Sequence, residues 1–230
     1  MKNHVIKQIG IFVLAACALG AGHAAQAGTQ HVSITTGALN GLGTYYVEFT
    51  LTDGSGLGNG NSFAGVSNFS INGGVLGAVL PPTLGDVSGA LGGANTLGLT
   101  DTNAGTGGLA DFAQGFTINS ATGTITFDLT LAGAGVEPVT PDAFTFQLLD
   151  GSFTPIATSG PVGSELVASD FTSLTPTATG YHSDGVYEPS IVATLTPITA
   201  VPEPGAFASL TLGAFALSAL LLCGRRRRMA

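Results

Sequence analysis

The chain has 230 residues and is acidic, with 14 Asp and Glu residues against six Lys and Arg residues. All six basic residues lie near the two ends, so the stretch from Gly28 to Ala200 contains no Lys, no Arg and no Cys. An acidic surface repels nucleic acid phosphates, which excludes nucleic acid as a partner, and the missing Cys excludes a disulfide framework. About 170 residues bury enough surface to fold without disulfides, so we expect one domain here.

The N-terminal residues 1–27 have the three parts of a secretory signal. Lys2 and Lys7 form a basic start, residues 9–19 form an apolar run, and Ala25-Gln26-Ala27 supplies small residues at a cleavage site. We therefore expect a signal peptide that is removed after Ala27. A second interpretation stays open, because Leu14-Ala15-Ala16-Cys17 looks like a lipobox, in which a lipidated Cys17 becomes the first mature residue.

Residues 28–200 alternate apolar and polar side chains with the period of two that is typical of half-buried strands. Tyr45, Val47, Phe49 and Leu51 form one such row, and Ile125, Phe127, Leu129 and Leu131 form another. Further strands are expected around Phe112 to Ile118 and Phe144 to Leu148, and shorter ones over residues 31–35, 67–71, 166–171 and 191–196.

The connections between these rows are rich in Gly, Asn, Asp and Pro, which favour turns, and no stretch shows a sustained helical period. Many short strands separated by turns predict an all-β fold, an antiparallel β-sandwich that is jelly-roll-like. The glycine-rich residues 73–108 are the least readable part of the chain; short strands and long loops are compatible with them, and we assign them no definite structure.

One loop carries oxygen-rich side chains. Asp53, Ser55, Asn59 and Asn61 lie in a glycine-rich segment, and calcium takes carboxylate, amide and backbone oxygens from such loops. The spacing fits neither an EF-hand nor a repeated nonapeptide, and an ordinary hairpin loop explains the same residues. We therefore expect no cofactor, with calcium at these four residues as the alternative.

No catalytic motif stands out in the expected mature chain. It has two imidazoles, His31 and His182, no thiol and no G-x-S-x-G elbow, and Ser183 and Asp184 beside His182 are ordinary in a Ser-rich chain. Glycoside hydrolysis needs only two carboxylates, but the chain has no Trp for sugar stacking. The only substitutes capable of exposure are the four Tyr residues, Tyr45, Tyr46, Tyr181 and Tyr187. We expect no enzyme, and a secreted glycoside hydrolase is the weakest alternative.

The C-terminal residues 201–230 combine three features. Val201-Pro202-Glu203-Pro204 is expected to be extended, because proline disfavours helix at the preceding residue. Residues 205–224 are twenty residues without a charge, and a helix of that length spans about 30 Å, the thickness of a bilayer core. Four arginines follow and mark the cytoplasmic side, namely Arg225, Arg226, Arg227 and Arg228.

In this order, the Pro-Glu-Pro motif, the uncharged span and the Arg cluster resemble the C-terminal sorting signal of PEP-CTERM proteins. The resemblance implies processing near the motif by an exosortase, a membrane cysteine transpeptidase of Gram-negative bacteria that make extracellular polysaccharide. Two phrases, Phe49 to Gly56 and Pro141 to Asp150, also resemble an uncharacterised group of PEP-CTERM proteins, which implies no activity.

These observations predict export by the general secretion machinery, transient anchoring with the domain in the periplasm, and release to the cell surface or the medium. The expected function is a noncatalytic envelope or extracellular-matrix protein, associated with extracellular polysaccharide. A carbohydrate-binding module or adhesin with a calcium site is the alternative.

Overall fold

A computed structural model describes residues 28–198, except residues 82, 94, 134–139, 174, 188 and 189. The predicted signal peptide, the Pro-Glu-Pro motif, the predicted membrane helix 205–224 and the Arg cluster lie outside the described residues. Within those residues there is no helix of the length and hydropathy that crossing a bilayer requires.

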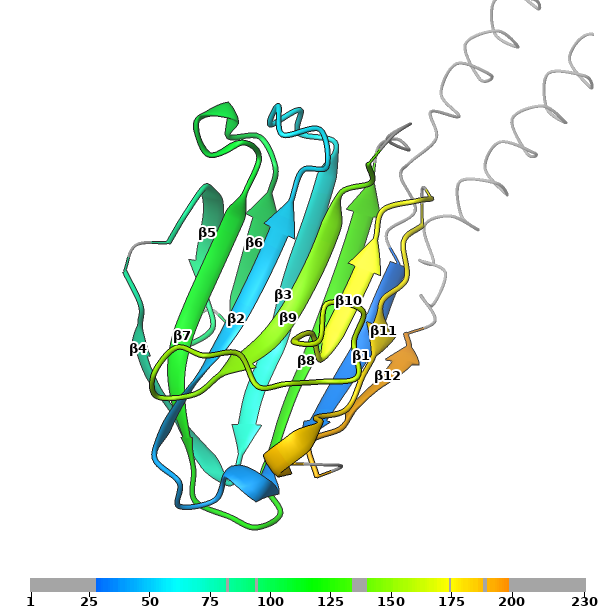
Figure 1. The fold of residues 1–230 in the computed structure, drawn as a ribbon. Helices are drawn as coiled ribbons and strands as arrows, with labels where there is room; N and C mark the ends of the chain where they lie inside the picture. Colours follow the sequence, from blue (N-terminus) through cyan, green and yellow to red (C-terminus); the bar gives the residue numbers. More distant parts are fainter. Residues whose placement is uncertain are drawn as a thin grey trace, which may run out of the picture. The chain divides into compact units, whose positions relative to one another are not determined.

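The described residues form strands joined by turns and three short 3-10 helices (Figure 1). The strands are β1 (Gly28–Thr35), β2 (Thr44–Thr52), β3 (Ser62–Asn72), β4 (Gly74–Val79), β5 (Asp86–Ala90), β6 (Thr96–Thr100), β7 (Ala110–Ile118), β8 (Thr124–Gly133), β9 (Ala143–Leu149), β10 (Val167–Asp170), β11 (Thr179–Gly180) and β12 (Ala193–Pro197). The 3-10 helices are η1 (Gly37–Leu39), η2 (Ala104–Thr106) and η3 (Gly185–Tyr187).

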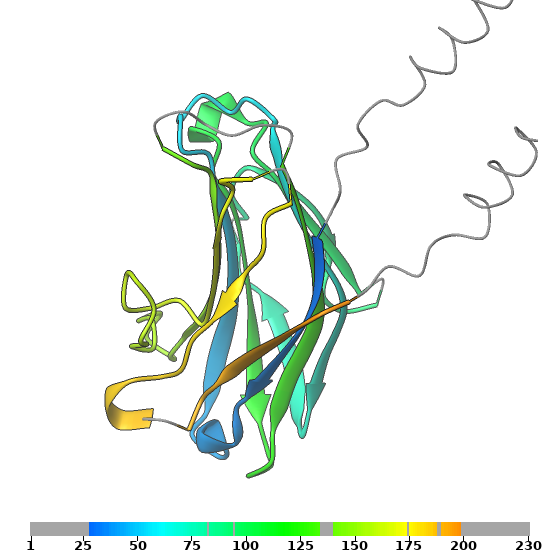
Figure 2. The same ribbon diagram turned by 90° about the vertical axis from the view of Figure 1, so that its right-hand side faces the viewer.

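These strands make two six-stranded sheets, in the orders β12-β1-β8-β3-β6-β5 and β11-β10-β9-β2-β7-β4. The paired strands are antiparallel in both sheets. Figure 2 shows the two sheets facing each other as two layers. The fold is therefore an all-β antiparallel sandwich, as the sequence predicted.

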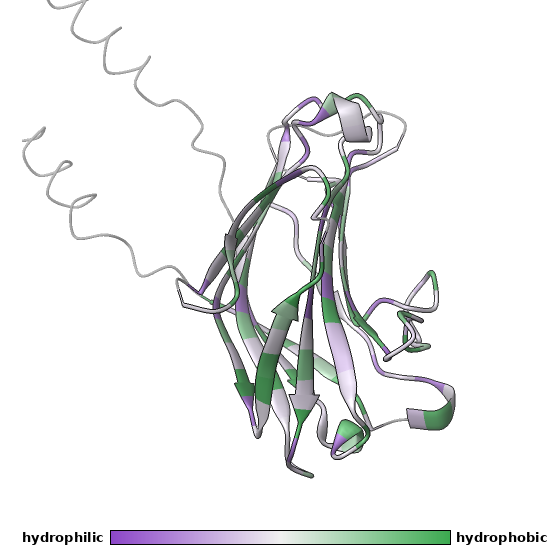
Figure 3. Ribbon diagram, turned by 90° about the vertical axis from the view of Figure 1, so that its left-hand side faces the viewer, coloured by the Kyte–Doolittle hydropathy of each residue, from purple (hydrophilic) through white to green (hydrophobic). Residues whose placement is uncertain are grey.

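The alternation read from the sequence defines the inner faces of the sheets. Phe49 on β2 and Phe127 on β8 are both completely buried, and their ring centroids lie 5.4 Å apart across the sandwich. Phe146 on β9 lies 4.9 Å from Phe49, and Phe69 on β3 completes the aromatic cluster. Figure 3 shows hydrophobic and polar bands alternating along the strands. The predicted inward rows are confirmed by the burial of their residues.

Two expectations need correction or completion. Tyr45, which we counted among the tyrosines capable of exposure, is only 4 % exposed, because it points inward with Val47 and Phe49. The unassigned residues 73–108 contain β4, β5 and β6. Because β4 and β5 are edge strands with mostly exposed side chains, they show little alternation of hydropathy.

One end of the sandwich gathers several chain segments. The register pairs Gly28 with Leu131 and Ser62 with Gly133, so the start of β1, the start of β3 and the end of β8 lie together. Pro197 pairs with Gln30, and the amide of Ile198 donates to the carbonyl oxygen of Thr29, 2.9 Å away. Both ends of the described domain therefore lie at the end where β2 and β6 also finish.

Candidate metal centre

Three buried aspartates meet at this end of the sandwich. Asp53 follows β2, Asp101 follows β6 and Asp142 precedes β9. Their exposed fractions are 3 %, 0 % and 1 %, and one carboxylate oxygen from each lies within 4.8 Å of the other two. The cluster thus joins loops from three separate parts of the chain.

Asp53 is the most extensively hydrogen-bonded of the three. Its Oδ1 accepts bonds of 2.6 Å from both the amide and the hydroxyl of Ser55, and its Oδ2 accepts from the amides of Gly58 and Asn59. Burial would raise the pKa of Asp53, but these donors outweigh burial and lower the pKa below its ordinary value. These donors therefore stabilise the negative charge of Asp53, and the β2–β3 loop is shaped around its carboxylate.

Asp142 links two loops. Its Oδ1 accepts a 2.8 Å bond from the amide of Gly54, and its Oδ2 accepts a 2.5 Å bond from the hydroxyl of Ser62. The amide of Ser62 in turn donates to Asp101 Oδ1 at 3.2 Å. Ser62 at the start of β3 therefore bridges Asp101 and Asp142.

Asp101 is the least well paired carboxylate. Its Oδ2 is buried and has no hydrogen-bond partner within the described part of the chain. Burial is the main cause that raises the pKa of Asp101, and the charges of Asp142 and Asp53 raise it further, against a partial offset from the Ser62 amide. The site therefore holds a carboxylate in surroundings that disfavour its negative charge.

Among the residues that the structure describes, no Lys or Arg side chain is present to balance this charge. The sequence has no Lys or Arg from Gly28 to Ala200, and its two His residues in that range pair elsewhere. His31 contacts Asp128 at 2.7 Å, and His182 lies 3.6 Å from Asp184. The negative charge of the three carboxylates must therefore be offset by backbone N–H donors, by protonation or by a bound cation. A hard divalent cation suits a site whose ligands are all oxygen atoms.

Of the four residues predicted from the sequence as calcium ligands, only one belongs to this cluster. Asp53 joins the cluster, whereas Ser55 donates its hydroxyl to Asp53. Asn59 and Asn61 shape the loop. Asn59 Oδ1 accepts from the amide of Asn61, and Asn61 Oδ1 lies 3.2 Å from the Ser62 hydroxyl, whose one proton goes to the closer Asp142 oxygen.

Sequence reasoning missed Asp101 and Asp142. One signal was present, because the triplet Leu-Thr-Asp ends at Asp53 and recurs ending at Asp101. Each triplet closes a strand, so two carboxylates with the same place at the ends of two strands could have been paired. Asp142 gives no comparable signal beyond its place directly before an alternating row.

Glycines let the loops approach this closely. A Cβ atom at Gly108 would lie 2.2 Å from the Cβ of Asp53, and Gly108 also has a φ of +74°. A Cβ atom at Gly54 would lie 2.1 Å from the carbonyl oxygen of Thr140. Side chains at either position would push the aspartate-bearing loops apart.

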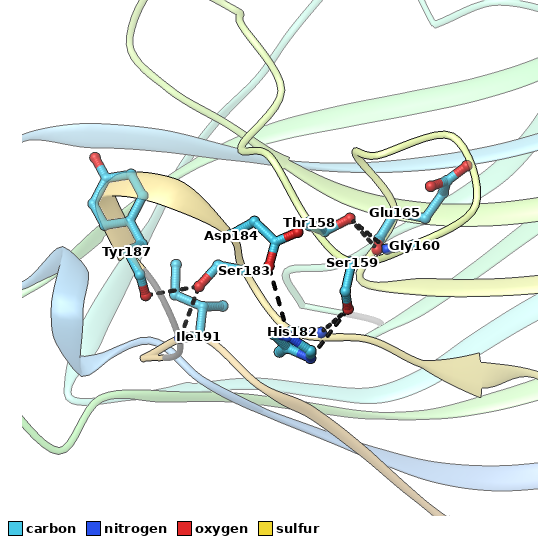
Figure 4. A network of polar contacts seen from close by, with 9 residues as sticks. All are labelled: Thr158, Ser159, Gly160, Glu165, His182, Ser183, Asp184, Tyr187 and Ile191. Atoms are coloured by element: carbon cyan, nitrogen blue, oxygen red, sulfur yellow. Dashed lines mark hydrogen bonds and ion pairs between the residues drawn. The ribbon is translucent and has the colours of Figure 1, made fainter.

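A second polar network, drawn in Figure 4, lies on loops at the opposite end of the sandwich, where His182 pairs with Val192 beside Thr35, the last residue of β1. The Ser159 hydroxyl lies 3.1 Å from His182 Nδ1, and Asp184 lies beside Nε2 of the same imidazole. Ser183, the serine next to His182 in sequence, is instead buried and donates to the carbonyl of Tyr187. His182 and Asp184 are both nearly half exposed, so water screens their interaction. This network fixes loops and offers little to activate a nucleophile.

A shallow depression of about 420 Å³ lies on the outer face of the sheet that contains β3 and β6. Gly65 and Gly98 form its floor, and the ring of Phe63, which is 38 % exposed, lies against both. Ser67, Ser88 and Thr130 are among its lining residues.

Comparison with models of protein families, with curated proteins and with solved structures finds no match for this chain.

Proposed function

We propose that the chain is an exported, noncatalytic envelope or extracellular-matrix protein. A PEP-CTERM-type sorting signal delivers it, and exosortase processing removes the anchor. One observation carries the proposal. Gly28, the residue directly after the expected signal cleavage site, already pairs with Leu131 on β8, and Pro197, shortly before the Pro-Glu-Pro motif, still pairs with Gln30 on β1.

The arrangement of the two domain ends supports the same interpretation. Gly28 and Pro197 lie on neighbouring strands, and the Ile198 amide bonds to Thr29. A sandwich with both ends at one place can be held by a short tether there while its remaining loops face outward. That geometry suits a surface domain that is anchored first and released later.

The order of strands supports a jelly-roll-like connectivity for this domain. From β1 to β5 each successive strand belongs to the other sheet, and the same alternation recurs from β6 to β9. Such crossings between layers are typical of double-sheet jelly rolls, a fold that surface and lectin domains share.

The processing step is tested by replacing Pro202 and Pro204 with Ala in a Gram-negative host that has an exosortase. Alanine restores a backbone donor and favours helix, so the membrane helix should extend and the motif should no longer be presented in extended form. We expect the wild type at the surface or in the medium without residues 205–230, and the variant at full length in the inner membrane.

An internal epitope tag, gel mobility and cell fractionation follow both forms. Pro161→Ala, in an exposed loop, is the control and should be processed as the wild type is. A wild-type protein that keeps Arg225 to Arg228 at steady state contradicts the sorting signal, and leaves only a permanent anchor.

A carbohydrate-binding module or adhesin is the second candidate, and the depression around Phe63 favours it. An exposed aromatic ring above a glycine floor, with hydroxyl groups around it, offers a sugar both an apolar face and hydrogen bonds. A glycan array with the wild type and Phe63→Ala tests this role, with Leu57→Ala as an exposed apolar control. Glycan binding lost only in Phe63→Ala supports a lectin-like role, and turnover of a glycan would instead indicate a hydrolase.

A further inference from the structure

The buried aspartates that join three loops at one end of the sandwich need a counter-charge. We infer that Asp53, Asp101 and Asp142 together bind one calcium ion. The inference concerns the folded domain and does not depend on how the chain is sorted. It replaces the loop-only ligand set suggested by sequence with ligands from three separate segments.

The unpartnered oxygen of Asp101 is the observation that points to a ligand. Asp101 is completely buried, and its Oδ2 has no hydrogen-bond donor among the described residues. A buried polar atom without a partner is rare, because it loses its water and gains nothing in return. A cation between the carboxylates would satisfy this oxygen directly.

The neighbouring carboxylates also have coordination capacity left. Each carboxylate offers about four lone-pair sites, and Asp142 accepts one bond on each oxygen from Gly54 and Ser62. Asp53 already accepts four bonds, but one comes from the Ser55 hydroxyl, which can rotate away. If the Ser55 O–H bond turns away from Asp53, one lone pair of the Asp53 carboxylate becomes free. The Ser55 oxygen can then act as a further ligand of the ion.

The spacing of the oxygens fits calcium. Calcium binds oxygens at 2.3 to 2.6 Å, so two ligands of one ion lie at most about 4.6 to 5.2 Å apart. The three carboxylate oxygens lie within 4.8 Å of one another, which is compatible with that limit. Magnesium requires shorter, nearly octahedral bonds and keeps several of its waters, which suits a buried site of three loops less well.

Nearby oxygen atoms can complete the coordination shell. The Ser62 hydroxyl is 2.5 Å from Asp142 Oδ2, and Asn61 Oδ1 is 3.2 Å from that hydroxyl. Three carboxylates give the site a formal charge of −3 when ionised. A divalent cation would offset most of this repulsion and fasten the ends of β2 and β6 to the start of β9.

A shared proton is the competing explanation, since protonating one carboxylate would also relieve the repulsion. The two differ in their response to calcium. The test uses the exported protein, which keeps every residue of the sandwich from Gly28 onward, purified in mild detergent and stripped with EDTA. Calorimetric titration with calcium chloride and thermal melting followed by circular dichroism are then measured on the same samples.

We expect one calcium per chain and a melting temperature that rises by about 5 to 10 °C at a hundredfold excess over Kd. Asp101→Asn keeps the size of the side chain but removes its charge. Because losing a residue that only orients a metal ligand weakens metal affinity about 10 to 100-fold, we expect the loss of this ligand itself to weaken binding at least about 100-fold. In EDTA the variant should melt no lower than the wild type, because one repelling charge is gone.

Asp184→Asn is the matched control, since it removes a carboxylate at the other end of the sandwich and should keep the full calcium response. A wild type whose heat signal and melting are unchanged by millimolar calcium overturns the inference. So does an equal calcium response in Asp101→Asn, which would place the ion elsewhere. If Asp101→Asn is destabilised by the same amount with and without calcium, the Asp101 carboxylate has a purely structural role and the inference is wrong. If magnesium stabilises the wild type as much as calcium does, the assignment to calcium is wrong.

Discussion

The hydroxyl oxygens of Tyr45 and Tyr187 lie 2.9 Å apart, although the two residues are 142 positions apart in the chain. Tyr45 points inward from β2, and Tyr187 ends η3, so the bond ties the late loop to the core sheet. Burial of Tyr45 is the main cause that raises its pKa well above the ordinary value, and the bond to Tyr187 and the charge of Asp150 add to it.

Alkaline pH should therefore destabilise the protein through Tyr45. Its pKa is higher in the folded than in the unfolded state, so its contribution is complete below the unfolded value of about 10. The contribution falls as pH rises from there toward the folded value. At pH 7, the urea midpoint of Tyr45→Phe should be slightly below that of the wild type, because one hydrogen bond is lost. Between pH 9 and pH 11, the midpoint of Tyr45→Phe should decrease by less than the midpoint of the wild type does. Tyr181→Phe is the control. Parallel pH profiles for the wild type and Tyr45→Phe would contradict the assignment.

The close packing at the aspartate cluster predicts a large difference between two glycine substitutions. Gly108 and Gly163 both have positive φ, +74° and +83°, so alanine at either costs about 1 to 2 kcal/mol in backbone strain. A Cβ at Gly163 meets nothing within 4 Å, whereas at Gly108 it would collide with Asp53. Urea denaturation should show Gly108→Ala to be clearly the less stable, and calcium should no longer stabilise it. Equal losses in both variants would mean that the loops can move apart freely.

The aromatic cluster should dominate the stability of the sandwich. Phe49 is completely buried and contacts the rings of Phe69, Phe127 and Phe146. Replacing it with Ala leaves a cavity between the sheets and should cost about 3 to 5 kcal/mol of unfolding free energy. Val186→Ala, at a side chain that is 95 % exposed, should stay within about 0.5 kcal/mol of the wild type. Chemical denaturation measures both, and a loss below about 1 kcal/mol for Phe49→Ala would argue against this core.

The sandwich could be predicted because burial on one face of a strand leaves a local pattern. Val47, Phe49 and Leu51 alternate with polar residues whatever lies across the sheet, so the row is visible in sequence. The edge strands β4 and β5 bury little and leave almost no such pattern. Their existence depends on pairing with β7 and β6, which is a property of the folded chain.

The aspartate cluster could be predicted from the sequence only in part, for the same reason. Asp53 stands out in sequence because its loop is rich in Gly and Asn, but Asp101 and Asp142 approach it only when β2, β6 and β9 lie in the two sheets. Ser55, Asn59 and Asn61 were chosen for their closeness along the chain, and the structure uses them to shape the loop around Asp53. Ligands that meet through the topology of two sheets cannot be identified by spacing alone.

The start of the mature protein separates the two interpretations of the N-terminal segment. If cleavage follows Ala27, β1 begins at the first mature residue, because Gly28 already pairs with Leu131 on β8. If Cys17 is lipidated instead, ten residues, 18–27, separate the lipid from the sandwich. We expect the first outcome, because the Ala-x-Ala site lies at the end of the apolar run where a signal peptidase cuts.

Intact-mass spectrometry and N-terminal sequencing of the exported protein decide between the two. We expect a chain that starts at Gly28 without a lipid mass, and Cys17→Ser should give the same chain, because a serine of similar size leaves the cleavage site untouched. Ala27→Leu should instead slow cleavage and leave the precursor in the membrane fraction, because the site requires a small residue at that position. A diacylglyceryl mass on Cys17 that disappears in Cys17→Ser would show that the sandwich is held by a lipid at its N-terminal end. Since β1 and β12 are neighbours, that lipid would tether the sandwich at the same end as the C-terminal helix, and removal of the helix by an exosortase would no longer release the protein.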